Sequence, residues 1–368
     1  MEDAMESPNT HFSLYAIERI SSGLLRGGGD DEDFDPAILP FEVLPGLTIE
    51  DVSPLIRDDE FDVFENFIGQ HTYESLSRLK YAIIHRFPEL EFDESGKITA
   101  FSTDLIFRSR TLVREAAACL RLLRPTTQHL HFFEGRIDHE GFLTRIAFDT
   151  PLDNVINPIS HRTLAFRSAD AHSLRIYLPR FREAMAGEFW KYRMCIAMHE
   201  SGHFQNDDWR AKFFLWTTAV ESLFTTQSRD AQHSGSLVAR ERIKSFLGGA
   251  TPIYPPEELS SVYTNPNLTV ADIIGDLYCL RNHIAHGDRI PAYYFETGRS
   301  NIYGDDISRY DMLLEAISFI IRHSLLKILR DGLLNDFADA RSSQAYFGAL
   351  GLTKNLLKKS AAHYPCAT

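Results

Sequence analysis

Residues 209–226 read WRAKFFLWTTAVESLFTT, and this stretch decides the fold class of the second half of the chain. Its larger side chains recur at the spacing of one helix face, formed by Phe213, Trp216, Thr217, Val220 and Phe224. Acidic residues come directly before it, so Asp207 or Asp208 is the expected N-cap. The pattern predicts one helix over this stretch with that face buried.

Helical spacing continues on both sides of this stretch. Further helices are predicted for residues 173–187, 188–203, 237–247, 270–286 and 307–334. Gly287 follows the helix at 270–286 at the position of a helix C-cap. Residues 169–368 are therefore expected to form an all-α helical bundle.

The first part of the chain has a different pattern. Residues 81–87 form an apolar run of strand length, residues 111–123 show helical spacing, and residues 129–148 suggest a hairpin. We interpret residues 1–168 as a mixed α/β domain of unknown fold. The whole chain is thus predicted to be an α+β protein with two domains.

Composition narrows the class of protein. Of 368 residues, 44% are apolar and 24% are charged, as in globular proteins, and no apolar run is long enough to span a membrane. The first residues do not have the pattern of a signal peptide. The four cysteines are far apart and are expected to be reduced thiols. We therefore expect a cytoplasmic protein.

The net charge of −13 argues against a broad surface for nucleic acid, because phosphate binding requires clustered cations. A local basic groove remains compatible with this charge. Arg240, Arg242 and Lys244 lie close together in the predicted helix at residues 237–247. They are the candidates for contacts with RNA.

The segment RNHIAHG at residues 281–287 carries the first constellation of chemical interest. It places Arg281 five positions before His286, with four residues between them. The segment follows the helix at 209–226 and a basic helix, and it precedes a long closing helix. With Glu221 in the first of these helices and Leu277-Tyr278 before Arg281, this order resembles the HEPN family. The similarity is to its ApeA-like branch and covers about residues 188–334.

The resemblance implies a function. Many members of the family are metal-independent endoribonucleases that act as dimers, and others are inactive modules that bind RNA or a protein partner. For this chain the resemblance implies an RNA-cleaving homodimer without a cofactor, as in a toxin or an anti-phage effector. The N-terminal domain would then respond to an unknown activator or inhibitor. An inactive HEPN module is the alternative.

The residues themselves fit that chemistry. A histidine with a pKa near 6.5 can move a proton near neutral pH, and an arginine can hold two phosphate oxygens. Arg281 and His286 are the candidate catalytic residues, Asn282 could orient the histidine ring, and His283 and Glu221 are candidate supporting residues.

Residues five apart on a helix point about 140° apart, so Arg281 and His286 of one chain cannot face the same way. A two-fold dimer in which the helices ending at Gly287 approach each other would bring the two types of side chain together. Two structural interpretations stay open. Arg281 could pair with Glu221, and His286 could stabilise a helix end.

A second constellation is His199-Glu200-Ser201-Gly202-His203, which has the HExxH spacing of zinc peptidases. On a helix the two histidines share a face and could bind zinc, with Glu200 as general base and Glu221 as third ligand. The opposite face is expected to be the buried one, formed by Trp190, Met194, Ala197, Met198 and Ser201. A zinc peptidase is therefore a further alternative. The simpler interpretation is that these residues form a solvated helix face without a metal.

Overall fold

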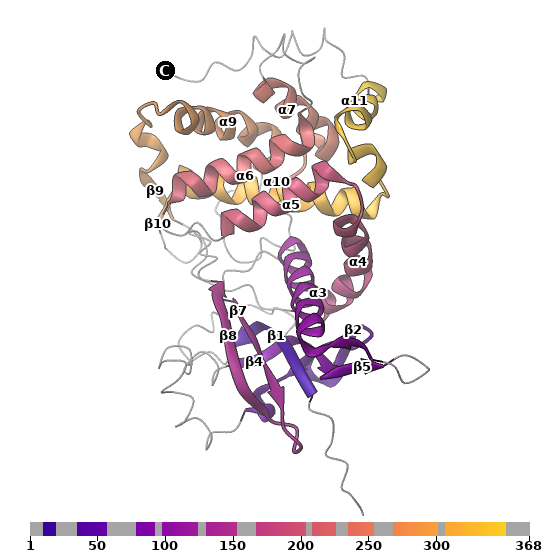
Figure 1. The fold of residues 1–368 in the computed structure, drawn as a ribbon. Coiled ribbons are helices and arrows are strands. Elements are labelled where there is room, and N and C mark those ends of the chain that lie inside the picture. The colour runs from indigo at the N-terminus through magenta and orange to yellow at the C-terminus, as the bar shows by residue number, and fades with distance from the viewer. Residues whose placement is uncertain are drawn as a thin grey trace, which may run out of the picture. The chain divides into compact units, whose positions relative to one another are not determined.

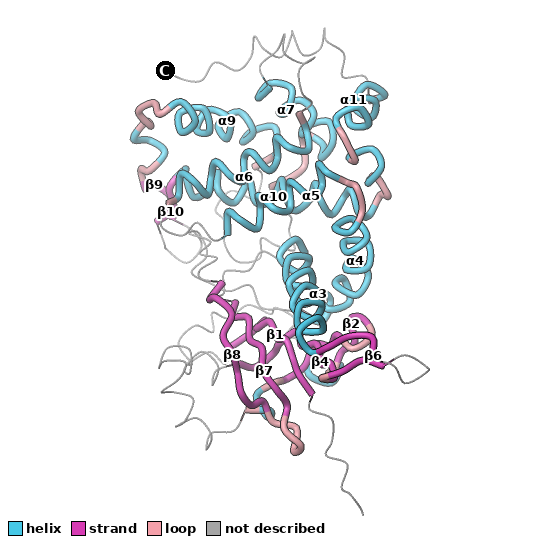
Figure 2. The backbone as a smooth tube through the Cα atoms, viewed as in Figure 1, coloured by secondary structure: helices cyan, strands magenta, loops and turns pink. Residues whose placement is uncertain are grey.

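The computed structural model describes residues 10–19, 35–56, 79–92, 98–123, 130–152, 167–203, 208–225, 235–253, 268–300 and 306–350 (Figures 1 and 2). The chain divides into two compact units, residues 1–155 with 162–179 and residues 156–161 with 180–368. The α+β class is confirmed, but the boundary falls inside helix α4 (Ser168–Ala186) and not at residue 168. None of the described helices combines the length and the apolar character needed to span a membrane.

The first unit is built on an antiparallel sheet with the strand order β2-β3-β4-β1-β7-β8. These strands are β1 (Thr10–Arg19), β2 (Phe41–Leu44), β3 (Leu47–Asp51), β4 (Leu79–Pro88), β7 (Leu130–Ile137) and β8 (Leu143–Leu152). A small hairpin of β5 (Leu90–Phe92) and β6 (Ile98–Phe101) precedes helix α3 (Ser102–Leu123), which packs on β4 and β1. The predicted strand at 81–87 and the hairpin at 129–148 are both confirmed.

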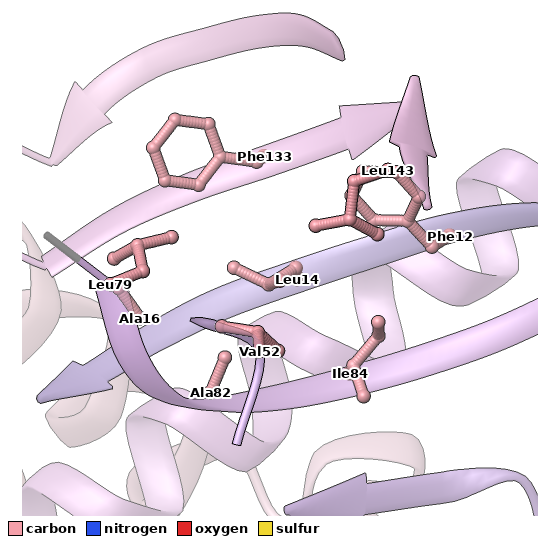
Figure 3. Close-up of a cluster of buried hydrophobic side chains, with 9 residues drawn as sticks. All are labelled: Phe12, Leu14, Ala16, Val52, Leu79, Ala82, Ile84, Phe133 and Leu143. Atoms are coloured by element: carbon pink, nitrogen blue, oxygen red, sulfur yellow. The ribbon is translucent and has the colours of Figure 1, made fainter. Parts of the chain in front are cut away.

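The two faces of this sheet carry different side chains and contact different neighbours, because successive side chains of a strand point to opposite faces. Tyr15 faces α3, where its hydroxyl accepts a hydrogen bond of 2.6 Å from Nη1 of Arg121. Its neighbour Leu14 points the other way, into an apolar cluster (Figure 3). That cluster consists of Phe12, Leu14, Ala16, Val52, Leu79, Ala82, Ile84, Phe133 and Leu143. Helix α3 also buries apolar side chains, among them Val113, Ala116 and Leu120, so apolar burial stabilises the packing on both faces of the sheet.

The second unit is a helical bundle with α6 at its centre. It contains α5 (Trp190–His203), α6 (Trp209–Phe224), α7 (Gly235–Ile243), α9 (Val270–His286), α10 (Arg309–Arg330) and α11 (Ala340–Ala349). A π-helical turn (Lys244–Gly248) follows α7, and a two-stranded sheet of β9 (Thr297–Ser300) and β10 (Asp306–Ser308) precedes α10. Helix α6 packs against α5, α7, α9 and α10. The predicted helical bundle is therefore present after α4, but it is not all-α, because β9 and β10 form a short two-stranded sheet within it.

Local sequence explains where the central helices begin and end. Asp208 caps α6 by accepting hydrogen bonds from the backbone amides of Arg210 and Ala211. Thr269 and Asp272 form a capping box at the start of α9. The same helix ends at Gly287, whose φ of +69° is a left-handed conformation that glycine adopts without steric cost. Both predicted caps, Asp208 and Gly287, are confirmed.

The predicted inward face of α6 is confirmed as well, since all five of its residues are buried. The cysteine prediction is wrong at one position, because Cys279 takes part in a disulfide. Cys119 and Cys195 are free and buried, as expected for reduced thiols. Cys366 lies outside the described residues.

Candidate functional site

Arg281 lies on α9 at the point where this helix contacts α6. Its Nη2 atom lies 3.0 Å from Oε2 of Glu221, and its Nη1 atom donates to Oδ1 of Asn282 at 3.4 Å. The guanidinium carbon is 5.7 Å from the centre of the Phe214 ring. About a fifth of the side chain (22%) remains exposed. The ion pair with Glu221, one of the two structural alternatives, is therefore formed, and it leaves part of the arginine open to solvent.

His286 is the last residue of α9 and is exposed. It stands on a different side of the helix from Arg281, as the 140° offset requires. The side-chain oxygen of Asn282 accepts a hydrogen bond from Arg281, and the expected support of the His286 ring by Asn282 stays a prediction. His283 is half-buried, with its ring 6.5 Å from that of Tyr294. One chain thus offers an anchored arginine and an exposed histidine, separated around the helix.

Charge and burial act in opposite directions on Glu221. Burial raises the pKa of its carboxyl group above the usual value, and the nearby Arg281 guanidinium opposes this rise without cancelling it. Tyr278, one turn before Arg281, is fully buried, and burial followed by the charge of Glu221 raises the pKa of its hydroxyl. The arginine is therefore held by a partner that gains a proton more readily than an ordinary glutamate.

The arginines predicted to line a basic groove are not exposed in the single chain. Arg240 and Arg242 are both buried, and Nη1 of Arg242 donates to the backbone oxygen of Phe224 at 2.8 Å. Lys244 pairs with Glu241. Because α7 packs against α6 and α9, its arginines face neighbouring helices. This geometry gives Arg240 and Arg242 contacts within the bundle, and their predicted role in RNA binding receives no support from it.

The HExxH segment occupies the last turns of α5, and its two histidines are buried. The exposed fraction is 0% for His199 and 8% for His203. Their Nε2 atoms are 3.2 Å apart, and Oε1 of Glu200 is 3.6 Å from Nδ1 of His199. One potential ligand atom from each of these three residues lies within 4.8 Å of the others. The three side chains therefore form a compact group with the donor types that transition metals prefer.

Trp216 of α6 packs against both imidazoles. Its ring centre is 5.6 Å from that of His199 and 5.1 Å from that of His203, and its Nε1–H donates to the backbone oxygen of His199 at 2.9 Å. A Cβ atom on Gly202 would lie 2.3 Å from Nε1 of Trp216. The glycine of this segment thus makes room for the indole.

The predicted orientation of α5 is wrong. Trp190 is 63% exposed, Ala197 and Ser201 are exposed, and the buried face instead includes Tyr192, Cys195, Ile196, His199 and His203. Tyr192, Cys195 and Ile196 also follow helical spacing, which could have indicated this face. The predicted buried face instead included Trp190, which is a large apolar residue. The expected solvated face of the two histidines is instead the face that packs on α6.

Glu221 does not act as the expected third ligand beside the two histidines. Its carboxylate pairs with Arg281, and the group that could hold a metal within the described part of the chain contains His199, Glu200 and His203. The two constellations are therefore separate groups of side chains, although both contact α6.

Comparison of the chain with family models, with curated proteins and with solved structures gives no match.

Proposed function

We propose that the protein is a metal-independent endoribonuclease in which Arg281 and His286 act on the scissile phosphate. The observation that carries this proposal is the placement of a partly exposed arginine, anchored by Glu221 at 3.0 Å, on the same helix as an exposed histidine. The resemblance of the 281–287 segment and its flanking helices to HEPN domains supports it.

The proposed chemistry uses the RNA as its own nucleophile. The 2′-oxygen attacks the adjacent phosphorus, the bond from phosphorus to the 5′-oxygen breaks, and the products are a 2′,3′-cyclic phosphate and a 5′-hydroxyl. His286 takes part in moving the proton from the 2′-hydroxyl toward the departing 5′-oxygen. Arg281 stabilises the charge that builds on the phosphate oxygens, which its planar guanidinium contacts in pairs.

The proposal requires two copies of the chain. The angular separation of Arg281 and His286 prevents both side chains of one α9 from facing one phosphate. In a two-fold dimer, Arg281 and His286 from both copies would line one cleft where the two α9 helices approach. We further propose a cytoplasmic toxin or anti-phage effector, controlled by an activator or inhibitor that binds the N-terminal unit.

The test compares wild type with His286→Ala on single-stranded RNA, with EDTA and with added zinc. Wild type is expected to cut under both conditions, and the variant to cut about 10²–10⁴-fold more slowly. RNA with a 2′-O-methyl group at the cut should be inert. His139→Ala removes an exposed histidine from the first unit and is the matched control.

Equal cleavage rates of wild type and His286→Ala would contradict the assignment of the catalytic site. So would cleavage that requires a divalent metal when the metal-free protein is still folded. Binding of RNA or of a protein partner without any cutting would instead favour the inactive HEPN module. The peptidase alternative receives less support, because a catalytic zinc needs an open position for substrate and both histidines of the HExxH segment are buried.

A further inference from the structure

We propose that His199 and His203 bind a structural divalent transition metal, with zinc as the best-fitting ion, and that Glu200 contributes the negative charge of the site. This inference does not rest on the proposed RNA chemistry, since it assigns the ion to the packing of α5 on α6. It departs from the expectation of a chain without a cofactor. The buried position of the two imidazoles, which differs from the predicted orientation of α5, is what motivates it.

The distance between the two nitrogens fits a shared ion. Zinc lies about 2.0–2.1 Å from each histidine nitrogen in a tetrahedral site, which places two such nitrogens roughly 3.3–3.4 Å apart. The Nε2 atoms of His199 and His203 are separated by 3.2 Å. Their ring centres are 4.5 Å apart, and the ring planes are 85° apart. Little movement of either side chain is therefore needed to admit the ion.

The charge of the site is also suitable. A divalent ion bound only by neutral imidazoles would be costly to bury, because an isolated charge loses its solvation. The Glu200 carboxylate lies next to the pair, with Oε1 3.6 Å from Nδ1 of His199. A carboxylate at this position can ligate the ion or support the imidazole that does, as in carboxylate–histidine–zinc arrangements. Lys212 also contacts the Trp216 ring. Burial lowers the pKa of Lys212 to about 8, so its positive charge is largely kept near neutral pH and is lost only at higher pH.

The surroundings hold the donors in place and limit access to them. Trp216 packs on both rings, and Gly202 lets the indole approach the turn between the two histidines. Side chains fixed in this way lose little freedom when an ion binds. Both imidazoles are buried, which limits the access of a substrate to the ion, and together with Glu200 they supply three of the four donors of a tetrahedral zinc site.

The same 3.2 Å separation would also suit a hydrogen bond between two neutral imidazoles, and metal titration distinguishes the two cases. The full chain is first treated with chelator, dialysed and checked for folding by circular dichroism. It is then titrated with Co²⁺, followed by competition with Zn²⁺. We expect one ion per chain, visible Co²⁺ absorption bands that disappear with Zn²⁺, partial quenching of the tryptophan fluorescence by Co²⁺ and a higher melting temperature with Zn²⁺.

Three variants accompany the wild type. His203→Ala should lose stoichiometric binding, and Glu200→Gln should bind about 10–100-fold more weakly. His139→Ala, in the first unit, should bind as wild type does. Glu200 is partly exposed, so its variant keeps the test valid if His203→Ala does not fold. Absence of stoichiometric binding by wild type, or equal affinity in wild type and Glu200→Gln, would overturn the proposal and leave a histidine–histidine hydrogen bond.

Discussion

Helices α5 and α9 both end on a histidine, yet the two histidines have opposite environments. His203 follows His199 by four residues, an offset of about 40° around the helix, so the pair shares one face. His286 follows Arg281 by five residues, an offset of about 140°, so these two do not. The first pair is buried against Trp216, whereas His286 is exposed. The spacing of four residues therefore lets His199 and His203 contact one ion. The spacing of five residues directs Arg281 and His286 to different sides of α9, as the proposed dimer interface requires.

The glycine of the HExxH segment in α5 and the glycine that follows His286 of α9 are required for different reasons. Gly202 is required for space, since a Cβ atom there would meet the indole of Trp216 at 2.3 Å. At Gly287 no atom of the described residues lies within 4 Å of a potential Cβ, and glycine is required there for its φ of +69°. The α5 motif is thus constrained by a neighbouring helix, and the α9 motif by the conformation of its own chain.

The largest expected effect concerns chemistry at α9. Arg281→Lys should slow RNA cleavage by about 10²–10³-fold, the usual loss when one preorganised donor to a transition state is removed. Lysine keeps the charge but loses the planar two-point contact. Single-turnover cleavage rates measure the effect, with circular dichroism to show that the fold is kept. A lysine variant as fast as wild type would mean that only the charge at this position matters.

The second prediction concerns space at α5. Gly202→Ala should lower the free energy of unfolding by about 1–3 kcal/mol, because the rigid indole must shift to admit the methyl group. Gly348→Ala in α11 is the control, since within the described part of the chain no atom lies within 4 Å of a Cβ at that position. Removing a helical glycine there should be neutral or stabilising, by up to about 1 kcal/mol. Urea denaturation of both variants measures the difference, and a Gly202→Ala protein as stable as wild type would show that α5 and α6 separate easily.

The third prediction concerns conformation at α9. Gly287→Ala should cost about 1 kcal/mol of unfolding free energy, because an L-residue is strained in the left-handed region. Gly287→Asn should restore part of the loss, since asparagine tolerates this conformation. At Gly202 the same Asn substitution should be worse than Ala, because space is limiting there. If Asn and Ala behave alike at Gly287, the end of α9 is not held in the left-handed conformation.

The smallest expected effect is a pH dependence at Glu221. Burial raises the pKa of this carboxyl in the folded state, so the native protein binds the proton more readily than the unfolded chain does. Wild type should therefore gain stability relative to Glu221→Gln as the pH falls through the folded pKa toward the ordinary value of 4.5. Unfolding free energies of both proteins across this range measure the difference. A relative loss of stability on acidification would instead show that pairing with Arg281 outweighs burial.

The sequence alone was sufficient for features set by local chemistry. The predicted inward face of α6, the cap at Asp208 and the end of α9 at Gly287 are confirmed. Each depends on side chains within a few residues, through apolar spacing, an acidic cap or the conformational freedom of glycine. The α+β order of strands before helices follows from the same local patterns.

Only the tertiary structure decided which chemical groups meet. The sequence offered two apolar faces for α5, and packing against Trp216 selected the one that carries His199 and His203. Glu221 was a possible partner for either motif, and the approach of α9 to α6 paired it with Arg281. Arg240 and Arg242 are buried because α7 packs against its neighbours, although their charge suggested a surface groove. Helical periodicity defines the faces of each helix, but the side chains of distant helices determine which face is buried.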